Sequence, residues 1–244
     1  MSEVRTIPLS DRQQLAAILD RRSAADALAG YYALEHPEER VRLYGYASSQ
    51  GDPLGFLAVA RTGLDLFRPL LVPFVGRKEI LNRLLRDAIR PGQPFLLHLP
   101  FEQIHWIDGE VQVDSRRDSE LLRLEPSAFE PILNVLVVEA KSPGGEIRYE
   151  IRTAQGINAA AGVNWMGERF AEIYLDAEEP ARGRKLTQSV LSALVARLLG
   201  ERRIPLYRVK THRIAVKTEA FHVGFRPTGV KTSLIAGSLL AEEK

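Results

Sequence analysis

The sequence contains no cysteine among its 244 residues. A chain without thiols cannot form disulfides, thiolate nucleophiles, cysteine-based zinc sites or iron–sulfur clusters. It also lacks a long hydrophobic run, because its longest apolar stretch, 64–75, is interrupted by Asp65, Arg68 and two prolines. We therefore expect no membrane span. The N-terminal residues lack the apolar core of a signal peptide, so the expected location is the cytoplasm.

The remaining composition is ordinary, with 45% hydrophobic and 26% charged residues. These values are typical of a globular protein and argue against a disordered or collagen-like chain. The length fits one large domain or two small ones. His98, His105 and Glu102 have no spacing suited to zinc, so we expect no metal site.

The net charge of +2 conceals an uneven distribution. Residues 1–130 hold 16 basic and 19 acidic residues, whereas residues 131–244 hold 17 basic and 12 acidic residues. Within the second half, the stretch 182–217 has ten basic residues and one acid, Glu201. Such a stretch is expected to attract an anion, which could be nucleic acid, a membrane surface or a polyphosphate ligand.

One segment of the second half combines a strand, a basic loop and a long helix. The pattern predicts a strand over Arg169–Ala177 and a helix over Leu186–Leu199, with Gly200 as its C-cap. The peptide N–H groups at the start of a helix have no partners within it and favour anions. Three cations in the loop, Arg182, Arg184 and Lys185, make a pyrophosphate cradle plausible. On these residues alone, a helix start with solvated basic residues remains the alternative.

The first half repeats this order. It shows a strand over Leu54–Arg61, an extended segment over Phe67–Phe74, a helix over Glu79–Ile89 and a strand over Pro94–Leu99. We therefore predict two related halves. Between and after them we also expect a hairpin over Gln103–Val113, a strand over Asn134–Ala140 and a helix over His212–His222.

The strand, basic loop, helix, next strand and final Gly224-Phe225-Arg226-Pro227 resemble the GNAT superfamily of acetyl-CoA-dependent N-acetyltransferases. The family's cofactor loop typically reads Arg/Gln-x-x-Gly-x-Gly/Ala, and its last motif ends in Gly-Phe-x-Pro. The resemblance covers roughly residues 134–240. It implies an α/β (α+β) fold of two GNAT-like domains, each with a mixed, mostly antiparallel central sheet flanked by helices. Residues 1–130 would be a degenerate copy, and residues 131–244 the copy that binds acetyl-CoA.

The resemblance also assigns residues to the coenzyme. The backbone of Tyr174, Leu175 and Asp176 would bind the pantetheine arm. The pyrophosphate would be held by the loop and helix start, which comprise Arg182, Gly183, Arg184, Lys185, Leu186, Thr187 and Gln188. Lys185 and Thr187 occupy the two positions where the family prefers small residues. From charge alone, the candidates for the ribose phosphate are Arg208, Lys210 and Arg213.

For catalysis, the resemblance implies that an amine attacks the thioester directly after losing a proton. Glu172, in Phe170-Ala171-Glu172-Ile173, is the candidate base, and an exposed strand glutamate without a task is the alternative. The family's tyrosine acid is replaced by Ala220, so the acid is missing or relocated.

The sequence thus predicts an N-acetyltransferase that acts on a small-molecule or peptide amine. The alternative is a catalytically silent GNAT-like module that binds acyl-CoA. Nucleic-acid binding ranks last, because the basic stretch has few aromatic residues. A homodimer is left open.

Overall fold

The computed structural model describes residues 3–63, 65–142, 144–153, 156–177 and 186–241. They form two compact units: unit 1 comprises residues 1–119 and 231–244, and unit 2 comprises residues 120–230. Both are mixed α/β structures with mostly antiparallel sheets flanked by helices, as predicted. The units differ from the halves divided at residue 130 chiefly because the C-terminal segment packs in unit 1. No helix in the described ranges is both long and apolar enough to cross a membrane.

Unit 1 is built on a sheet in which β4 and β5 run parallel, with the register Leu70↔Leu96 and Leu71↔Leu97. The strands follow the order β1 (Glu3–Thr6), β2 (Val41–Ala47), β3 (Pro53–Ala60), β4 (Leu70–Val75), β5 (Pro94–Pro100), β12 (Phe225–Leu239) and β6 (Val111–Leu124). Helix α2 (Lys78–Ala88) matches the predicted helix to within one residue. Its buried stripe consists of Ile80, Leu81, Leu84 and Leu85.

Short helical segments complete unit 1. They are η1 (Leu9–Ala17), α1 (Ala27–Gly30), η2 (Tyr31–Glu35), η3 (Glu38–Arg40) and η4 (Phe101–Ile107). The predicted hairpin over Gln103–Val113 is wrong, because its first part is η4. Pro100 precedes this turn in an extended conformation, and Gln103 donates a side-chain hydrogen bond to the carbonyl of Val75 at 3.3 Å.

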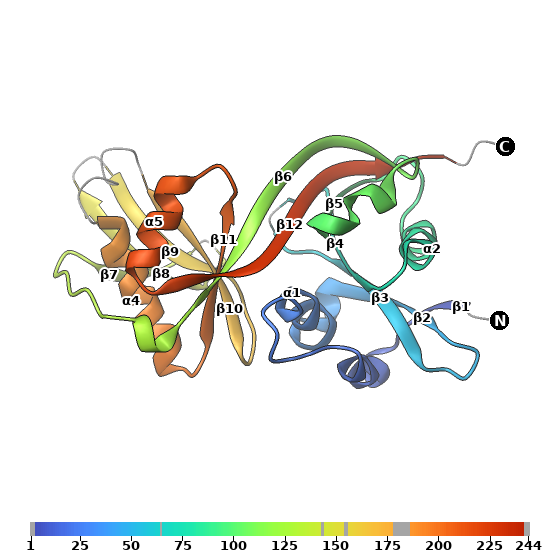
Figure 1. Cartoon of the computed structure of the whole chain (residues 1–244), viewed down its shortest axis with the longest axis horizontal. Coiled ribbons are helices and arrows are strands. Elements are labelled where there is room, and N and C mark those ends of the chain that lie inside the picture. Colours follow the sequence, from blue (N-terminus) through green and yellow to red (C-terminus); the bar gives the residue numbers. More distant parts are fainter. Residues whose placement is uncertain (1–2, 64, 143, 154–155, 178–185, 242–244) are drawn as a thin grey trace. The chain divides into compact units, whose positions relative to one another are not determined.

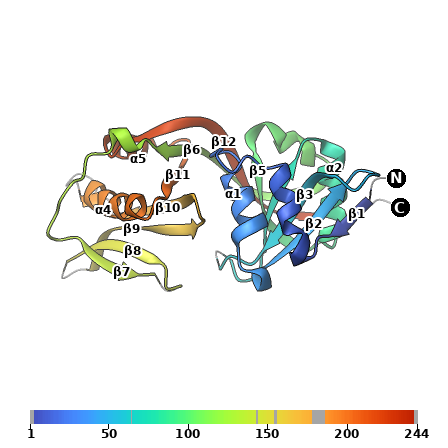
Figure 2. The same ribbon diagram turned by 90° about the horizontal axis from the view of Figure 1, so that it is seen from below.

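Unit 2 has the strand order β6, β11 (Ile204–Lys210), β10 (Phe170–Ala177), β9 (Gly156–Met166), β8 (Ile147–Thr153) and β7 (Val138–Lys141). Helix α4 (Leu186–Gly200) packs on strands β8 to β11, and α5 (Ile214–His222) packs against α4. Figure 2 shows α4 lying along the sheet, with β7 at the sheet's edge. The helix buries one apolar stripe, made of Val190, Leu191, Leu194, Val195 and Leu198.

The strand predicted over Asn134–Ala140 is shorter than expected, since β7 begins only at Val138. The Asn134 carbonyl accepts the N–H of Val137 at 3.1 Å, and the Asn134 Oδ1 accepts the N–H of Leu136 at 3.0 Å. Asparagine commonly forms such local turns, which compete with strand pairing. A further short helical turn, η5 (Pro126–Ala128), precedes this segment.

Strands β6 and β12 each pass through both units, and Figure 1 shows their two long ribbons side by side. In unit 1, the strand beside β5 is the C-terminal part of β12, with the register Thr232↔Pro100 to Ser238↔Pro94. In unit 2, the strand beside β11 is β6. Each sheet is therefore completed by a strand that continues into the other unit.

The two units repeat one order of elements, because β7-β8-β9-β10-α4-β11 corresponds to β1-β2-β3-β4-α2-β5. They differ between the first two strands. In unit 1, that connection contains η1, α1, η2 and η3, whereas in unit 2 it comprises only residues 142–146, and the Ser142 N–H donates to the Glu146 carbonyl at 2.8 Å. Unit 2 thus lacks the counterpart of the first helices of unit 1 among its described residues.

Candidate functional site

Strands β10 and β11 separate partway along their length. Their parallel register runs from Phe170↔Ile204 to Ile173↔Tyr207 and goes no further within the described residues, although both strands continue. The carbonyl of Arg169 accepts the Ile204 N–H at 2.9 Å. Peptide groups alternate in direction along a strand. The N–H and C=O groups of every second residue after Arg169 therefore also point toward β11.

Leu175 is the first residue of that alternation beyond the last β10–β11 pair. Its N–H and C=O groups therefore face the gap between the two strands. Its side chain packs against the core of unit 2. The gap thus presents a peptide donor and a peptide acceptor, which is what an extended amide-containing ligand requires.

The same place in unit 1 offers fewer peptide groups to a ligand. The carbonyl of Pro69 accepts the Leu96 N–H at 2.9 Å, so Leu71, Pro73 and Val75 point toward β5. Pro73 has no N–H to donate, which explains why the pairing ends at Leu71. The carbonyl of Val75 is taken by the Gln103 side chain. Only two residues separate β4 from α2, too few for a phosphate-binding loop like the one predicted for the second half.

Tyr174 directs its side chain away from this gap. A Cβ atom added to Gly162 would lie 2.5 Å from the Tyr174 hydroxyl and 2.6 Å from Cζ. Gly162 is the cross-strand neighbour of Tyr174, so the ring lies across β9. Asp176 is exposed at the end of β10. The predicted backbone roles of Tyr174, Leu175 and Asp176 remain predictions.

Glu172 lies beside an irregularity in the sheet. Glu172 pairs with Trp165, whereas Ile173 pairs with Val163, so Asn164 is an extra residue on β9. Such a bulge bends its strand and redirects a side chain. Here Asn164 Nδ2 donates a hydrogen bond to Glu172 Oε1 at 3.2 Å.

The other oxygen of Glu172 is paired with Arg208. Arg208 Nη2 lies 2.9 Å from Glu172 Oε2, and Arg208 Nε lies 3.3 Å from the same oxygen. Glu172 is 7% exposed, so it is not the solvated strand glutamate that the sequence left open. Its neighbours Ala171 and Ile173 belong to the core cluster under α4, and Glu172 faces the opposite side of the sheet. Its catalytic role stays a prediction.

A second buried carboxylate lies on the same side of the sheet. Glu150 on β8 is 2% exposed and forms ion pairs with Arg148 and Arg152. Arg148 is opposite Gly162, over which the Tyr174 ring lies. The sequence carried a signal for this face, because Ile147, Tyr149 and Ile151 alternate with the charged residues. Nothing in the sequence paired Glu172 with Arg208, which is 36 residues away.

Two side chains in the first turn of α4 contact α5. Thr187 is buried, and its hydroxyl donates to Glu219 Oε2 on α5 at 3.4 Å. Gln188 Nε2 lies 3.5 Å from His222 Nδ1. Both side chains thus turn toward α5. Of the remaining predicted phosphate residues, Leu186 begins α4, whereas Arg182, Gly183, Arg184 and Lys185 lie outside the described residues.

Ala220 occupies the position at which the resemblance expects a tyrosine acid. Ala220 is fully buried in the core of unit 2.

Of the candidates for the ribose phosphate, Arg208 is the partner of Glu172, whereas Lys210 and Arg213 are exposed beyond the end of the β10–β11 pairing. No group of three or more potential metal ligands occurs in the described part of the chain.

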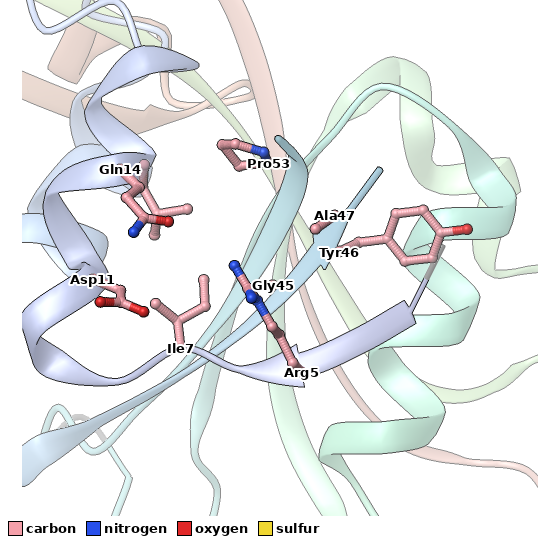
Figure 3. Close-up of a pocket in the computed structure, with 9 residues that line it drawn as sticks. Arg5, Ile7, Asp11, Gln14, Gly45, Tyr46, Ala47 and Pro53 are labelled. Atoms are coloured by element: carbon pink, nitrogen blue, oxygen red, sulfur yellow. The ribbon is translucent and has the colours of Figure 1, made fainter. Parts of the chain in front are cut away.

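A small crevice in unit 1 is unrelated to these residues. Figure 3 shows it between β1, η1 and β2, with Asp11 and Gln14 on one side and Tyr46 on the other. Its volume of about 20 Å³ is enough for a water molecule. It cannot hold a coenzyme.

Comparisons with solved structures identify the fold. A tandem GNAT protein from the clavulanic acid biosynthesis pathway superposes over 100% of both chains with a TM-score of 0.62 and 13% identity. A GCN5-related N-acetyltransferase from Sphaerobacter thermophilus covers 100% of this chain and 97% of its own, with a TM-score of 0.62 and 9% identity. A Drosophila protein covers 96% and 98%, with a TM-score of 0.70 and 12% identity.

No protein-family model matches the sequence, and no curated protein matches it significantly. At 9% to 13% identity, the structural likeness establishes the fold alone. The chain has the tandem GNAT fold that its sequence predicts, with a mixed, mostly antiparallel sheet and flanking helices in each unit.

Proposed function

We propose that this protein is an N-acetyltransferase that transfers the acetyl group of acetyl-CoA directly to an amine. The observation that carries the proposal is the gap beside Leu175, where the N–H and C=O groups of Leu175 point into the gap and the described register pairs Leu175 with no residue of β11. Acetyl-CoA supplies an activated acetyl thioester and an arm containing two amides. Leu175 can bind such an arm as a neighbouring strand would.

The start of α4 fits the phosphates of the same molecule. The helix follows β10 in the chain, and its first N–H groups and dipole favour an anion. The positive excess of the second half adds to this attraction. Unit 1 offers no equivalent donor and acceptor, because Pro73 has no N–H and the Val75 carbonyl already accepts a hydrogen bond from Gln103. We therefore assign one coenzyme to each chain.

Glu172 is the base in this proposal. The amine must lose a proton as its nitrogen bonds to the acetyl carbon, and the carbon–sulfur bond breaks to release the thiolate. Asn164 and Arg208 hold the carboxylate in a fixed orientation. The proton taken from the amine passes to Glu172, and the thiolate takes its proton from solvent because Ala220 cannot supply one. The acceptor is a small-molecule or peptide amine.

A silent acyl-CoA-binding module is the second candidate, and buried Ala220 is the observation that favours it. Two experiments, carried out one after the other, distinguish the enzyme from the silent binding module. Isothermal titration with acetyl-CoA should give one site per chain, and saturating ligand should raise the melting temperature. Release of free thiol in the presence of a panel of amines then distinguishes an enzyme from a binder. Absence of any binding at millimolar acetyl-CoA would refute both functions.

A further inference from the structure

Strand β7 is the terminal strand of the unit 2 sheet, and the described strand order ends with it. The Ser142 N–H donates to the Glu146 carbonyl at 2.8 Å, directly beyond the Lys141↔Ile147 pair. Hydrogen-bonded and non-bonded pairs alternate along an antiparallel ladder. Val138 and Ala140 therefore direct their peptide groups to β8, whereas those of Glu139 and Lys141 point outward along the free edge.

An apolar segment precedes this edge. Its large side chains are strongly exposed: Leu133 at 94%, Val135 at 99%, Leu136 at 59% and Val138 at 47%. The segment is held against α4, because the Ile132 N–H donates to Ser192 Oγ at 2.8 Å and Asn134 Nδ2 donates to Ser189 Oγ at 3.1 Å. The fixed backbone keeps these side chains in solvent. A cluster of exposed apolar residues beside an open strand edge is typical of an interaction surface.

We propose that β7 pairs with β7 of a second copy of this chain, antiparallel about a twofold axis at Ala140. In this register Glu139 faces the second copy's Lys141, and Lys141 faces its Glu139. Two pairs of opposite charges then form across the two strands, and each pair stabilises the strand pairing. The four outward peptide groups of one strand match those of the other.

Neighbouring registers fit less well. Centring the axis on Glu139 places two carboxylates opposite each other, and centring it on Lys141 places two ammonium groups opposite each other. Like charges at directly opposed positions destabilise a sheet. The first of these registers also pairs Lys141 with Val137, whose N–H is already bonded to the Asn134 carbonyl. The charges therefore select both the orientation and the register.

A second copy of this chain is favoured as the partner of β7, because the charges of β7 are complementary to those of β7 itself. The acid and the base that match each other lie two residues apart on the same strand. A twofold axis brings each to its counterpart without any other chain, which is the property of an isologous interface. The exposed apolar segment directly precedes the paired edge in each copy.

Cysteine crosslinking tests the register, since the natural chain has no cysteine to interfere. Ala140→Cys places the two thiols at a non-hydrogen-bonded pair, where Cα atoms are about 4.5 Å apart. That spacing permits a disulfide. We expect rapid intermolecular disulfide formation under mild oxidation. Val138→Cys is the matched control: it removes no charge, and the register offsets its symmetry mate by four residues, beyond the reach of a disulfide. Ser49→Cys, exposed in unit 1, reports random collision.

Charge exchange tests the pairing in a second way. Sedimentation of the full chain should show a dimer that Glu139→Lys or Lys141→Glu weakens at least tenfold, because each change opposes like charges. The double variant Glu139→Lys/Lys141→Glu should recover the dimer. Since Glu139 also accepts a hydrogen bond from the Tyr149 hydroxyl, Tyr149→Phe controls for that loss.

Two results would overturn the proposal. A chain that sediments as a monomer at high micromolar concentration has no such interface. A dimer that survives both single charge reversals, or in which Ala140→Cys crosslinks no faster than Ser49→Cys, is formed through another surface.

Discussion

Arg208 donates to Glu172 across adjacent strands at the point where those strands separate. Arg208 is the first residue of β11 after the last parallel pair, Ile173↔Tyr207, and its Nη2 lies 2.9 Å from Glu172 Oε2. The ion pair therefore lies at the closed end of the gap that Leu175 faces. It fixes the candidate base next to the binding site proposed for the coenzyme arm.

Replacing Glu172 by Gln should abolish the proposed base while keeping the size of the side chain. We expect turnover, measured as thiol release, to fall by about 100-fold or more, the scale of general base catalysis. Acetyl-CoA affinity, measured by titration, should stay within a few-fold. Glu130→Gln, an exposed residue, is the control and should keep full turnover. Unchanged turnover in Glu172→Gln would exclude this residue as the base.

Arg208→Gln leaves the buried carboxylate of Glu172 without its charged partner. The free energy of unfolding, measured with urea, should fall by about 2 kcal/mol, the scale of a charge-assisted hydrogen bond. The double variant with Glu172→Gln should lose less than the sum of the two single changes, because residues in contact are coupled. Strict additivity would show that the ion pair does not form in solution.

Gly162→Ala should disturb β10 through Tyr174, since the new methyl group would meet the tyrosine ring at 2.5 to 2.7 Å. We expect a loss of about 1–3 kcal/mol of stability, as for other overpacked sites, together with weaker acetyl-CoA binding. Gly162→Ala/Tyr174→Ala removes the opposing ring and should recover much of both losses. Failure of the double variant to recover would place the cause elsewhere than Tyr174.

His36 should make stability depend on pH. Burial, the largest cause, lowers the pKa of its imidazole below the ordinary value near 6.5. The unfolded chain then binds a proton more readily than the folded one, so the contribution of His36 is complete above about pH 6.5 and is lost as the pH falls toward the folded pKa. Melting curves between pH 7.5 and 5 should show this decline. His36→Gln should flatten the curve relative to His105→Gln, an exposed histidine, and equal slopes would contradict the assignment.

Local patterns were sufficient to predict the elements that carry the repeat. The apolar stripe of α4 and the alternation of β10 are encoded within single segments, and both elements formed within a residue of the predicted bounds. Two other predicted elements were wrong or too long because local side-chain hydrogen bonds favour a different backbone conformation. The Asn134 turn shortened β7, and Gln103 reaches the carbonyl of Val75 from a helical turn that had been interpreted as a hairpin.

The candidate site depends on contacts that no single segment records. Glu172 could be chosen from the sequence because its strand segment resembles that of GNAT proteins. Its hydrogen-bond partners, however, come from a bulge on β9 and from β11. The position of Asn164 depends on a one-residue shift in register, which periodicity cannot reveal. The hydrogen bond from Gln103 to the Val75 carbonyl in unit 1 was also not predictable, although the missing N–H of Pro73 can be read from the sequence.

The passage of β12 into unit 1 has a consequence for biosynthesis. Ile235 and Leu239 are part of the same buried cluster as Leu97 and Leu99, which a ribosome makes more than a hundred residues earlier. The nascent first half must wait, with the place beside β5 empty, until the residues of β12 have emerged. Unit 1 is therefore begun before unit 2 but completed after it, and a message truncated before the codons of β12 would prevent unit 1 from being completed.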